Sequence, residues 1–141
     1  MRLRAIIFDL DGTLLDTLED LADAMNSVLA ETRLPTHPVS AYRTFVGDGI
    51  EMLVRRSLPF EVPDEREFGR FVELARRAYA ERWSCKTRPY PGVPEMVRAF
   101  AAAGFQAAVL SNKPDDAAQA VVRAFLPGID FAVVLGATPS R

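Results

Sequence analysis

Hydrophobic residues gather in short runs at the beginning and toward the end of the chain. The first run is Ala5 to Leu10, with the sequence AIIFDL, and it stops just before an Asp-Gly pair. A short apolar run closed in this way predicts a strand that is buried on both faces of a parallel sheet. Two later runs, FQAAVLSN from Phe105 and FAVVL from Phe131, predict two further strands.

Between the first and second runs, hydrophobic residues recur at helical spacing instead. Leu18 to Leu29 shows this period directly after an Asp-Thr pair that can cap a helix. The segment 40–58, SAYRTFVGDGIEMLVRRSL, predicts two short helices joined at Gly47 to Gly49. A longer helix is expected after Asp64, because the hydrophobic positions that follow it lie on one stripe.

Prolines and glycines then mark a return to alternating strands and helices. The segment TRPYPGVPEMV, residues 87–97, is a proline-rich boundary. Pro94 to Ala103 predicts a helix that stops at Gly104, and Pro114 suits the first position of the next helix. The helical block is therefore bracketed by segments of a different kind.

The order of these elements predicts the fold class. Strand, inserted helical block, helix, strand, helix and strand describe an α/β protein with a Rossmann-like parallel sheet and right-handed crossovers. We expect residues 1–15 and 84–141 to form the α/β core and residues 16–83 to form an inserted α-helical domain.

Composition narrows the class of protein and of partner. Of 141 residues, 49% are hydrophobic and 26% charged, which is typical of a soluble globular protein. A net charge of -2 gives no electrostatic reason to expect a nucleic acid or an acidic membrane as partner, so we expect a small-molecule substrate. No segment approaches the roughly 20 apolar residues of a membrane span. Cys85 is the only cysteine, which excludes an intramolecular disulfide and favours the reducing cytoplasm.

Polar side chains follow two of the predicted strands at their carboxyl ends. Asp9 and Asp11 lie at the end of the first strand, and Ser111 and Asn112 at the end of the second. Ligands of open α/β sheets bind beyond the carboxyl ends of the strands. We therefore expect these residues, distant in sequence, to form one site.

Two neighbouring carboxylates suit chemistry on a phosphate ester. Their repulsion either raises the proton affinity of one or attracts a hard divalent cation, and Mg²⁺ is favoured over Ca²⁺ because it commonly binds one or two carboxylates with water and phosphate oxygens. One aspartate can attack phosphorus while the other transfers protons. Further candidate phosphate-binding residues supply close backbone approach, hydroxyl or amide donors and a positive charge: Gly12, Thr13, Ser111, Asn112 and Lys113.

Each pattern also has a simpler interpretation. Asp-Gly alone is usually a turn, and Ser111-Asn112 alone can cap a helix. An EF-hand loop is excluded because glycine and glutamate do not fall at the required positions. Gly47-Asp48-Gly49 lacks the third glycine of a dinucleotide loop and is interpreted as a helix junction. His37, between Thr36 and Pro38, is interpreted as a solvated loop residue.

The segments FDLDGTLLDT and VLSNKP resemble the signature motifs of haloacid dehalogenase superfamily phosphatases. PYPGV and FVGDGIEMLVRRSL are similar to segments of phosphoglycolate phosphatases that carry an α-helical cap. The resemblance implies that Asp9 is the nucleophile and a magnesium ligand, and that Asp11 is the acid/base and lends the metal its backbone carbonyl. It also implies that Ser111 and Asn112 hold the phosphoryl group, and that the α/β core has the fold of this superfamily.

One departure from the family is expected to matter. The family has a lysine soon after the third strand and acidic residues on a further strand, whereas this sequence ends VLGATPSR. We therefore expect an incomplete core, either a fragment of a longer phosphatase or a truncated product that self-associates through the edge exposed at Ala5 to Leu10.

The predicted function is Mg²⁺-dependent hydrolysis of a small phosphomonoester, with 2-phosphoglycolate favoured, through an aspartyl-phosphate. A sugar phosphomutase, or a phosphatase of sugar or pyrimidine phosphates, is an alternative that shares the same core. A catalytically incomplete binding or assembly module is another. Within the helical domain, Gly47, Gly49, Arg55 and Arg56 are candidate substrate contacts, although a solvated helix face also accounts for the arginine pair.

Overall fold

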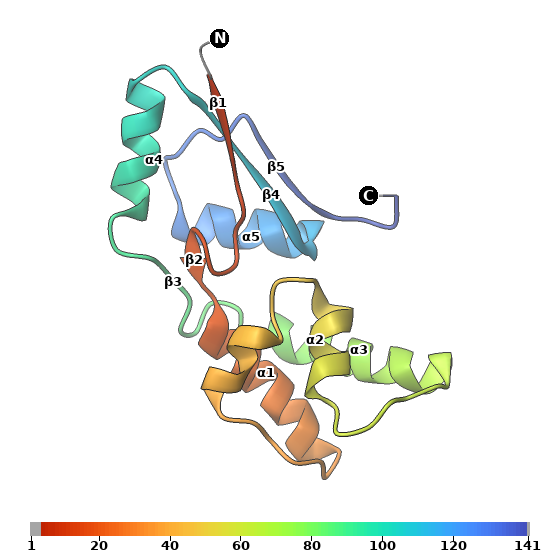
Figure 1. Ribbon diagram of the computed structural model, residues 1–141. Coiled ribbons are helices and arrows are strands. Elements are labelled where there is room, and N and C mark those ends of the chain that lie inside the picture. Colours follow the sequence, from red (N-terminus) through yellow and green to blue (C-terminus); the bar gives the residue numbers. More distant parts are fainter. Residues whose placement is uncertain (1–3, 141) are drawn as a thin grey trace. The chain divides into compact units, whose positions relative to one another are not determined.

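Residues 4–140 are described by the structure, a computed structural model, and fall into two units (Figure 1). The α/β unit holds the described residues up to Asp16 and from Arg88 onward, and the helical unit is Thr17–Thr87. The predicted α/β class is confirmed. Residues 84–87, which the sequence assigns to the core, belong to the helical unit because Lys86 and Thr87 are hydrogen-bonded to Asp20 there.

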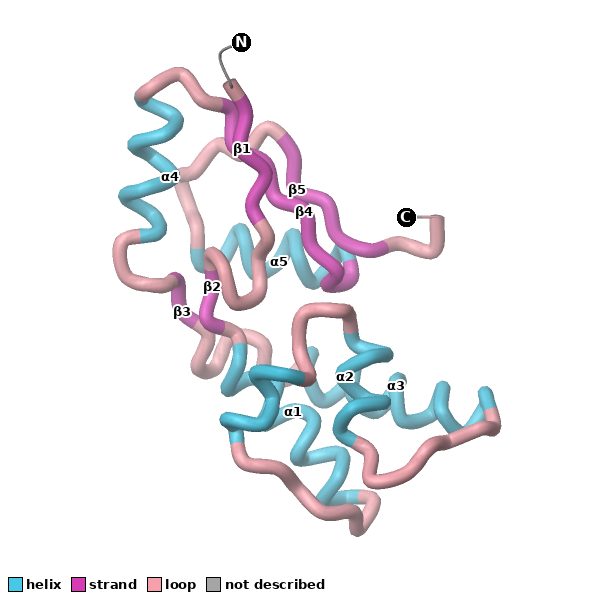
Figure 2. The backbone as a smooth tube through the Cα atoms, viewed as in Figure 1, coloured by secondary structure: helices cyan, strands magenta, loops and turns pink. Residues whose placement is uncertain are grey.

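A three-stranded parallel sheet forms the centre of the α/β unit (Figure 2). Its strands are β1 (Ala5–Phe8), β4 (Gln106–Pro114) and β5 (Val133–Ala137), in the order β1-β4-β5. Two helices provide the crossovers, α4 (Val93–Ala102) and α5 (Asp115–Phe125). Both crossovers advance across the sheet in the same direction, so right-handed connections put both helices on one face.

The two faces of this sheet differ in burial. Ala107 and Val109 of β4 lie on the helix-covered face and are 4% and 1% exposed. On the other face Ile7 is 70%, Leu110 55% and Val133 43% exposed. The expectation that the first strand is buried on both faces is therefore wrong: β1 alternates in burial, because only one face is covered by the described helices and β1 is an edge strand.

Strand boundaries also differ from those predicted. Strand β4 runs on to Pro114, which the sequence places at the first position of a helix. Helix α5 instead begins at Asp115, and Pro114 precedes it with an extended ψ of 140°. Lys113 is consequently a strand residue.

A second, very short sheet was not predicted. Strands β2 (Leu15–Asp16) and β3 (Arg88–Pro89) pair antiparallel, and the amide of Tyr90 donates to the carbonyl of Leu14 at 3.2 Å. Each strand has two residues, which is too short for a period-2 pattern to be visible in the sequence.

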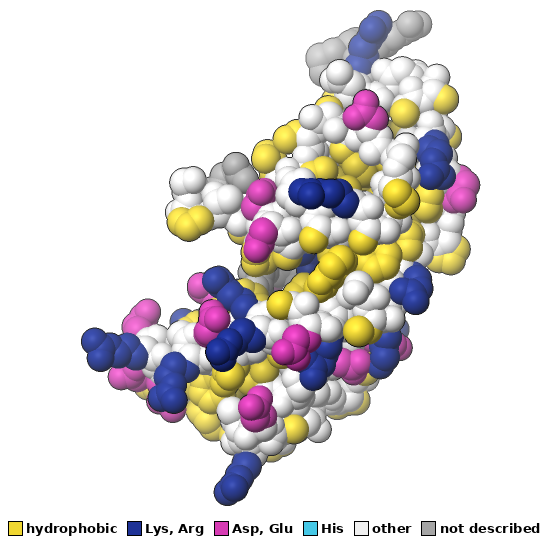
Figure 3. Space-filling model, turned by 180° about the vertical axis from the view of Figure 1, so that it is seen from behind, with side chains coloured by type: hydrophobic (Ala, Val, Ile, Leu, Met, Phe, Trp, Pro, Cys, Tyr) yellow, Lys and Arg dark blue, Asp and Glu magenta, His cyan; other side chains and the backbone are white. Residues whose placement is uncertain are grey.

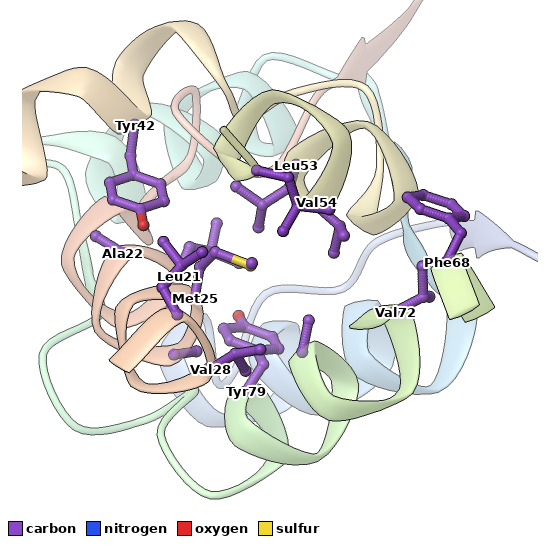
Figure 4. Close-up of a cluster of buried hydrophobic side chains, with 14 of the residues drawn as sticks. Leu21, Ala22, Met25, Val28, Tyr42, Leu53, Val54, Phe68, Val72 and Tyr79 are labelled. Carbon is purple, nitrogen blue, oxygen red and sulfur yellow. The ribbon is translucent and has the colours of Figure 1, made fainter. Parts of the chain in front are cut away.

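The helical unit consists of α1 (Leu18–Glu31), the 3₁₀ helix η1 (Val39–Thr44), α2 (Ile50–Ser57) and α3 (Glu65–Ala80). Their apolar faces meet in one buried cluster, in which Met25 and Val28 of α1 lie near Tyr79 of α3 (Figure 4). Asp64 caps α3 by accepting from the amides of Arg66 and Glu67, each at 2.9 Å. The predicted helices of this unit are thus present and share a single core.

His37 is not the solvated loop residue that the sequence suggested. It is half-buried, its Nε2 lies 2.7 Å from the carbonyl oxygen of Ser57, and its ring packs edge-on against Tyr42 and Phe45. The partners are five to twenty positions away in sequence, so a local pattern of polar and proline residues did not reveal them.

Charged side chains of both signs are mixed on the surface. On the face drawn in Figure 3, Lys and Arg lie among Asp and Glu, with no large area of one sign. Within residues 4–140, no helix has the length and apolar character needed to cross a bilayer.

Candidate active site

A tight turn after β1 is the scaffold of the candidate site. Leu10, which is fully buried, accepts backbone hydrogen bonds from the amides of Thr13, Leu14 and Leu15 at 3.0–3.2 Å. Gly12 lies in this turn with a φ of 78°, a conformation that favours glycine. Leu14 and Leu15 are also fully buried, so packing of these leucines fixes the turn. The residues on either side of Leu10 can still face the solvent.

The two aspartates flank that buried leucine. Asp9 is exposed, and the Thr13 hydroxyl donates to its Oδ2 over a long 3.5 Å. Asp11 is half-buried, and its Oδ1 lies 3.3 Å from the Nζ of Lys113. The structure thus brings Asp11 together with a residue more than one hundred positions away.

Lys113 reaches Asp11 from the end of β4. The lysine side chain is only 4% exposed, so its ammonium is held in the interior beside the Asp11 carboxylate. An ion pair taken out of water is stabilised only when its partners are close and hydrogen-bonded, and it is strongly destabilised when one partner is removed. Lys113 therefore fixes the position of Asp11 as well as adding positive charge.

Ser111 and Asn112 differ in their surroundings. Ser111 is buried, and its Oγ accepts from the backbone amide of Lys113 at 3.1 Å. Asn112 is exposed, in keeping with the alternation of side chains along β4. Ser111 shares the buried face with Lys113, whereas Asn112 does not.

Asp115 and Gly136 support the end of β4, and neither is among the site residues predicted from the sequence. The amide of Gly136 donates to Asp115 Oδ1 at 2.8 Å. A Cβ at Gly136 would lie 2.5 Å from the Asp115 Cα and 2.6 Å from the Lys113 carbonyl oxygen. Only glycine permits this close approach of β5, which sets the path of the backbone that carries Lys113.

The donor chemistry at Asp9 and Asp11 fits Mg²⁺. Two carboxylates after a rigid strand supply hard anionic oxygens, and Mg²⁺ often takes no more than two carboxylates, with water and phosphate oxygens filling its other positions. Within residues 4–140 there is no group of three or more His, Cys, Asp or Glu side chains that could hold a metal ion. Asp9 through its carboxylate, and Asp11 through its backbone carbonyl, are the residues of this turn that would hold such an ion.

The remaining candidate residues lie in the helical unit and have partners there. Gly47 and Gly49 have φ values of 114° and 89°, and Gly49 precedes α2. The Arg55 guanidinium lies 3.9 Å from the centre of the Phe68 ring. Arg56 bridges to Asp48 at 2.6 Å, and it also donates to the carbonyl of Phe45 at 3.2 Å, so it fixes the glycine-containing loop.

Comparison with known proteins places these features in a family. A family model described as haloacid dehalogenase-like hydrolase matches residues 3–141. The phosphoglycolate phosphatase of Nitrosospira multiformis is 40% identical over 116 residues, which cover 80% of this chain and 51% of that protein. The phosphoglycolate phosphatase of Haemophilus influenzae strain 86-028NP is 38% identical over 141 residues, which cover 94% of this chain and 62% of that protein.

A solved structure agrees with these relatives in fold. The crystal structure of a predicted phosphoglycolate phosphatase from Haemophilus somnus has a TM-score of 0.85 and 35% identity, covering 95% of this chain and 62% of that one. The chain spans about half to three-fifths of the length of the curated relatives named above. The resemblance predicted from FDLDGTLLDT and VLSNKP is confirmed, and the chain belongs to the haloacid dehalogenase-like hydrolase family.

Proposed function

We propose that this chain carries the nucleophile and phosphate-binding part of a Mg²⁺-dependent phosphomonoesterase, with 2-phosphoglycolate as the favoured substrate. The observation that carries the proposal is the ion pair between Asp11 and Lys113, at 3.3 Å, with the exposed Asp9 two residues before Asp11 in the chain. It joins an acidic turn to the end of a neighbouring strand, where open α/β sheets bind ligands. The names of the relatives support the substrate class.

Asp9 is the proposed nucleophile. Its carboxylate oxygen bonds to phosphorus while the bond from phosphorus to the ester oxygen breaks, and Asp11 gives a proton to the departing alkoxide. In the second step Asp11 takes a proton from water, which attacks phosphorus and breaks the bond to Asp9. The products are the alcohol and inorganic phosphate, and both aspartates return to their starting states.

Charge on the phosphoryl oxygens is the main electrostatic problem of this reaction. We assign its stabilisation to Lys113, to the donors of Thr13, Ser111 and Asn112, and to the backbone at Gly12. Mg²⁺ held by the Asp9 carboxylate and the backbone carbonyl of Asp11 would add positive charge and reduce the repulsion between the nucleophile and the phosphate. Ser111 and Lys113 contribute from the buried face, which fixes their positions.

The helical unit is proposed to act as a cap that selects the leaving group. Gly47 and Gly49 would shape the loop that faces substrate, with Arg56 holding the loop through Asp48 at 2.6 Å. Arg55 is the remaining candidate contact for an acidic leaving group. Sugar phosphates and pyrimidine phosphates are the alternative substrates, and the lone Cys85 is compatible with the reducing cytoplasm as the compartment.

Phosphate release in the presence of Mg²⁺ tests the proposal. The substrates are 2-phosphoglycolate and a panel of sugar and nucleotide phosphates, and the variants are Asp9→Asn and the control Asp116→Asn. Asp116 is an exposed aspartate in the first turn of α5 and has no role in the proposed chemistry. We expect release to fall to background in Asp9→Asn only. Equal turnover in Asp9→Asn and the unmodified chain would reject Asp9 as nucleophile.

A second candidate function is a phosphate-binding or assembly module without turnover. It is favoured by the absence, within residues 4–140, of a group of three or more His, Cys, Asp or Glu side chains that could hold a metal ion, and by the position of β1 at the sheet edge. Titration with Mg²⁺ and sedimentation over a concentration series separate the two candidates. Weak Mg²⁺ binding, no turnover and concentration-dependent association would favour the module, whereas tight binding with turnover would favour the enzyme.

A further inference from the structure

A buried carboxylate joins the two ends of the helical unit. Asp20, in the first turn of α1, is 1% exposed. Its oxygens accept from the amide of Lys86 at 3.0 Å, and from the amide and the hydroxyl of Thr87, each at 2.8 Å. Thr87 itself is fully buried. These contacts link residues that are 66 and 67 positions apart, at the entry to the unit and at its exit.

The arrangement satisfies a group that is otherwise costly to bury. A carboxylate removed from water is tolerated when several donors replace its hydration, and hydrogen bonds to a charged acceptor are stronger than neutral ones. The beginning of a helix also favours negative charge. Asp20 therefore stabilises the junction of α1 with the exit segment, and losing its charge would leave buried donors poorly paired.

The neighbouring lysine makes a separate, exposed contact. The Lys86 ammonium bridges to Asp23 at 2.6 Å, and this hydrogen bond raises the pKa of Lys86. That pair lies on the surface, where ion pairs contribute little to stability. The same residue thus offers a buried backbone contact to Asp20 and a surface side-chain contact to Asp23, which can be removed one at a time.

The same two chain segments are also joined within the α/β unit. There Leu15 pairs with Pro89 and Asp16 with Arg88. The connections Asp16–Thr17 and Thr87–Arg88 therefore lie between two places where the entering and leaving chains are held together.

We propose that Asp20 is a latch that closes the helical unit upon itself. It holds the exit segment, Lys86–Thr87, against the first turn of α1. With the latch intact, local opening of the exit segment is suppressed. Without it, this segment detaches from α1 although the apolar core of the unit is unchanged. The inference concerns the helical unit alone and does not depend on the proposed phosphatase activity.

Limited proteolysis of the whole chain measures this opening directly. Trypsin cleaves after lysine, and so it can cut the peptide bond between Lys86 and Thr87. The amide of this bond, that of Thr87, donates to the Asp20 carboxylate. Cleavage requires an extended, accessible backbone and therefore reports local opening. The rate at this bond is followed by mass spectrometry in native buffer for the unmodified chain, Asp20→Asn and the matched control Asp23→Asn.

We expect Asp20→Asn to accelerate cleavage at Lys86 about tenfold or more, because the charged acceptor of several hydrogen bonds is lost. Asp23→Asn should leave the rate nearly unchanged, since only the surface contact is removed. An unchanged rate in Asp20→Asn overturns the proposal. Equal acceleration in both aspartate variants overturns it as well, because exposure of the Lys86 side chain would then be sufficient.

A second pair of variants covers the case in which Asp20→Asn does not fold. Thr87→Val is nearly isosteric and removes only the hydroxyl that donates to Asp20, so cleavage at Lys86 should rise severalfold. Thr87→Ser keeps that hydroxyl and should restore a slow rate. If Thr87→Val and Thr87→Ser are cleaved as slowly as the unmodified chain, the latch is rejected.

Discussion

The helical unit and the α/β unit bury their hydrophobic residues in different ways. In the helical unit, side chains from four helical segments surround one core, and Leu29 and Tyr42 have no exposed surface. In the α/β unit, a sheet carries helices on one face, while Ile7 and Leu110 on the other are 70% and 55% exposed. A parallel sheet normally has both faces covered. The helical unit is thus self-contained, whereas the described sheet has apolar surface that its own helices do not protect.

The largest effect should come from opening the closed core. Leu29→Ala removes a fully buried side chain and should lower the free energy of unfolding of the helical unit by about 2–5 kcal/mol. Leu110→Ala makes the same chemical change on the open sheet face and should cost less than about 1 kcal/mol. Amide hydrogen exchange, followed separately for the helical unit and the α/β unit, measures the two losses of unfolding free energy. Similar losses from the two leucines would show that the difference in burial has no energetic meaning.

A smaller loss is expected where β5 approaches the end of β4. Gly136→Ala places a Cβ 2.5 Å from backbone, which has no flexible side chain to yield, and should cost about 1–3 kcal/mol. Gly104→Ala is a useful control, since a Cβ there meets nothing within 4 Å although its φ is 87°. The two variants separate steric overlap from backbone strain in thermal unfolding. If Gly136→Ala is as stable as the unmodified chain, the close approach of the strands is not required.

The closed core should also respond to alkaline pH. Burial raises the pKa of Tyr42 from 10.0 to about 12, and its hydroxyl donates to Asn26 Oδ1 at 2.7 Å. A phenol whose pKa is higher in the folded state stabilises that state fully below pH 10, and this contribution is lost as pH rises toward 12. Tyr42→Phe should therefore flatten the decline of stability over this interval, as measured by denaturant unfolding at several pH values. An equal decline in both proteins would contradict the assignment to Tyr42.

How much the sequence predicts depends on whether a feature is local. Helix α3 and strand β4 follow from periodicity and apolar runs within a single segment. The same reasoning missed the pairing of β2 with β3, because each contributes two residues. It also did not anticipate the burial of Lys113 or of Asp20, because that burial is decided by partners far away in the chain.

The candidate site shows the same division. Asp9 and Asp11 stand out because a specific local motif follows a strand, so their placement at its end was predicted from sequence. The contact of Asp11 with Lys113 at 3.3 Å required knowledge of how β4 continues past the last residue of β1. Gly136 has no local sequence signal, because glycine is required there by the nearby backbone of Lys113 and Asp115 and not by a positive φ.

The finest comparison lies between the two faces of the sheet itself. Val109 is 1% exposed on the covered face and Val133 is 43% exposed on the open face, and valine and threonine have nearly the same shape. Val109→Thr puts a hydroxyl among apolar atoms and should cost about 1–3 kcal/mol. Val133→Thr keeps the hydroxyl in water and should change stability by less than about 0.5 kcal/mol. Chemical denaturation of the two variants measures this difference. A large loss from Val133→Thr would mean that the open face is covered in solution, and equal losses would remove the distinction between the faces.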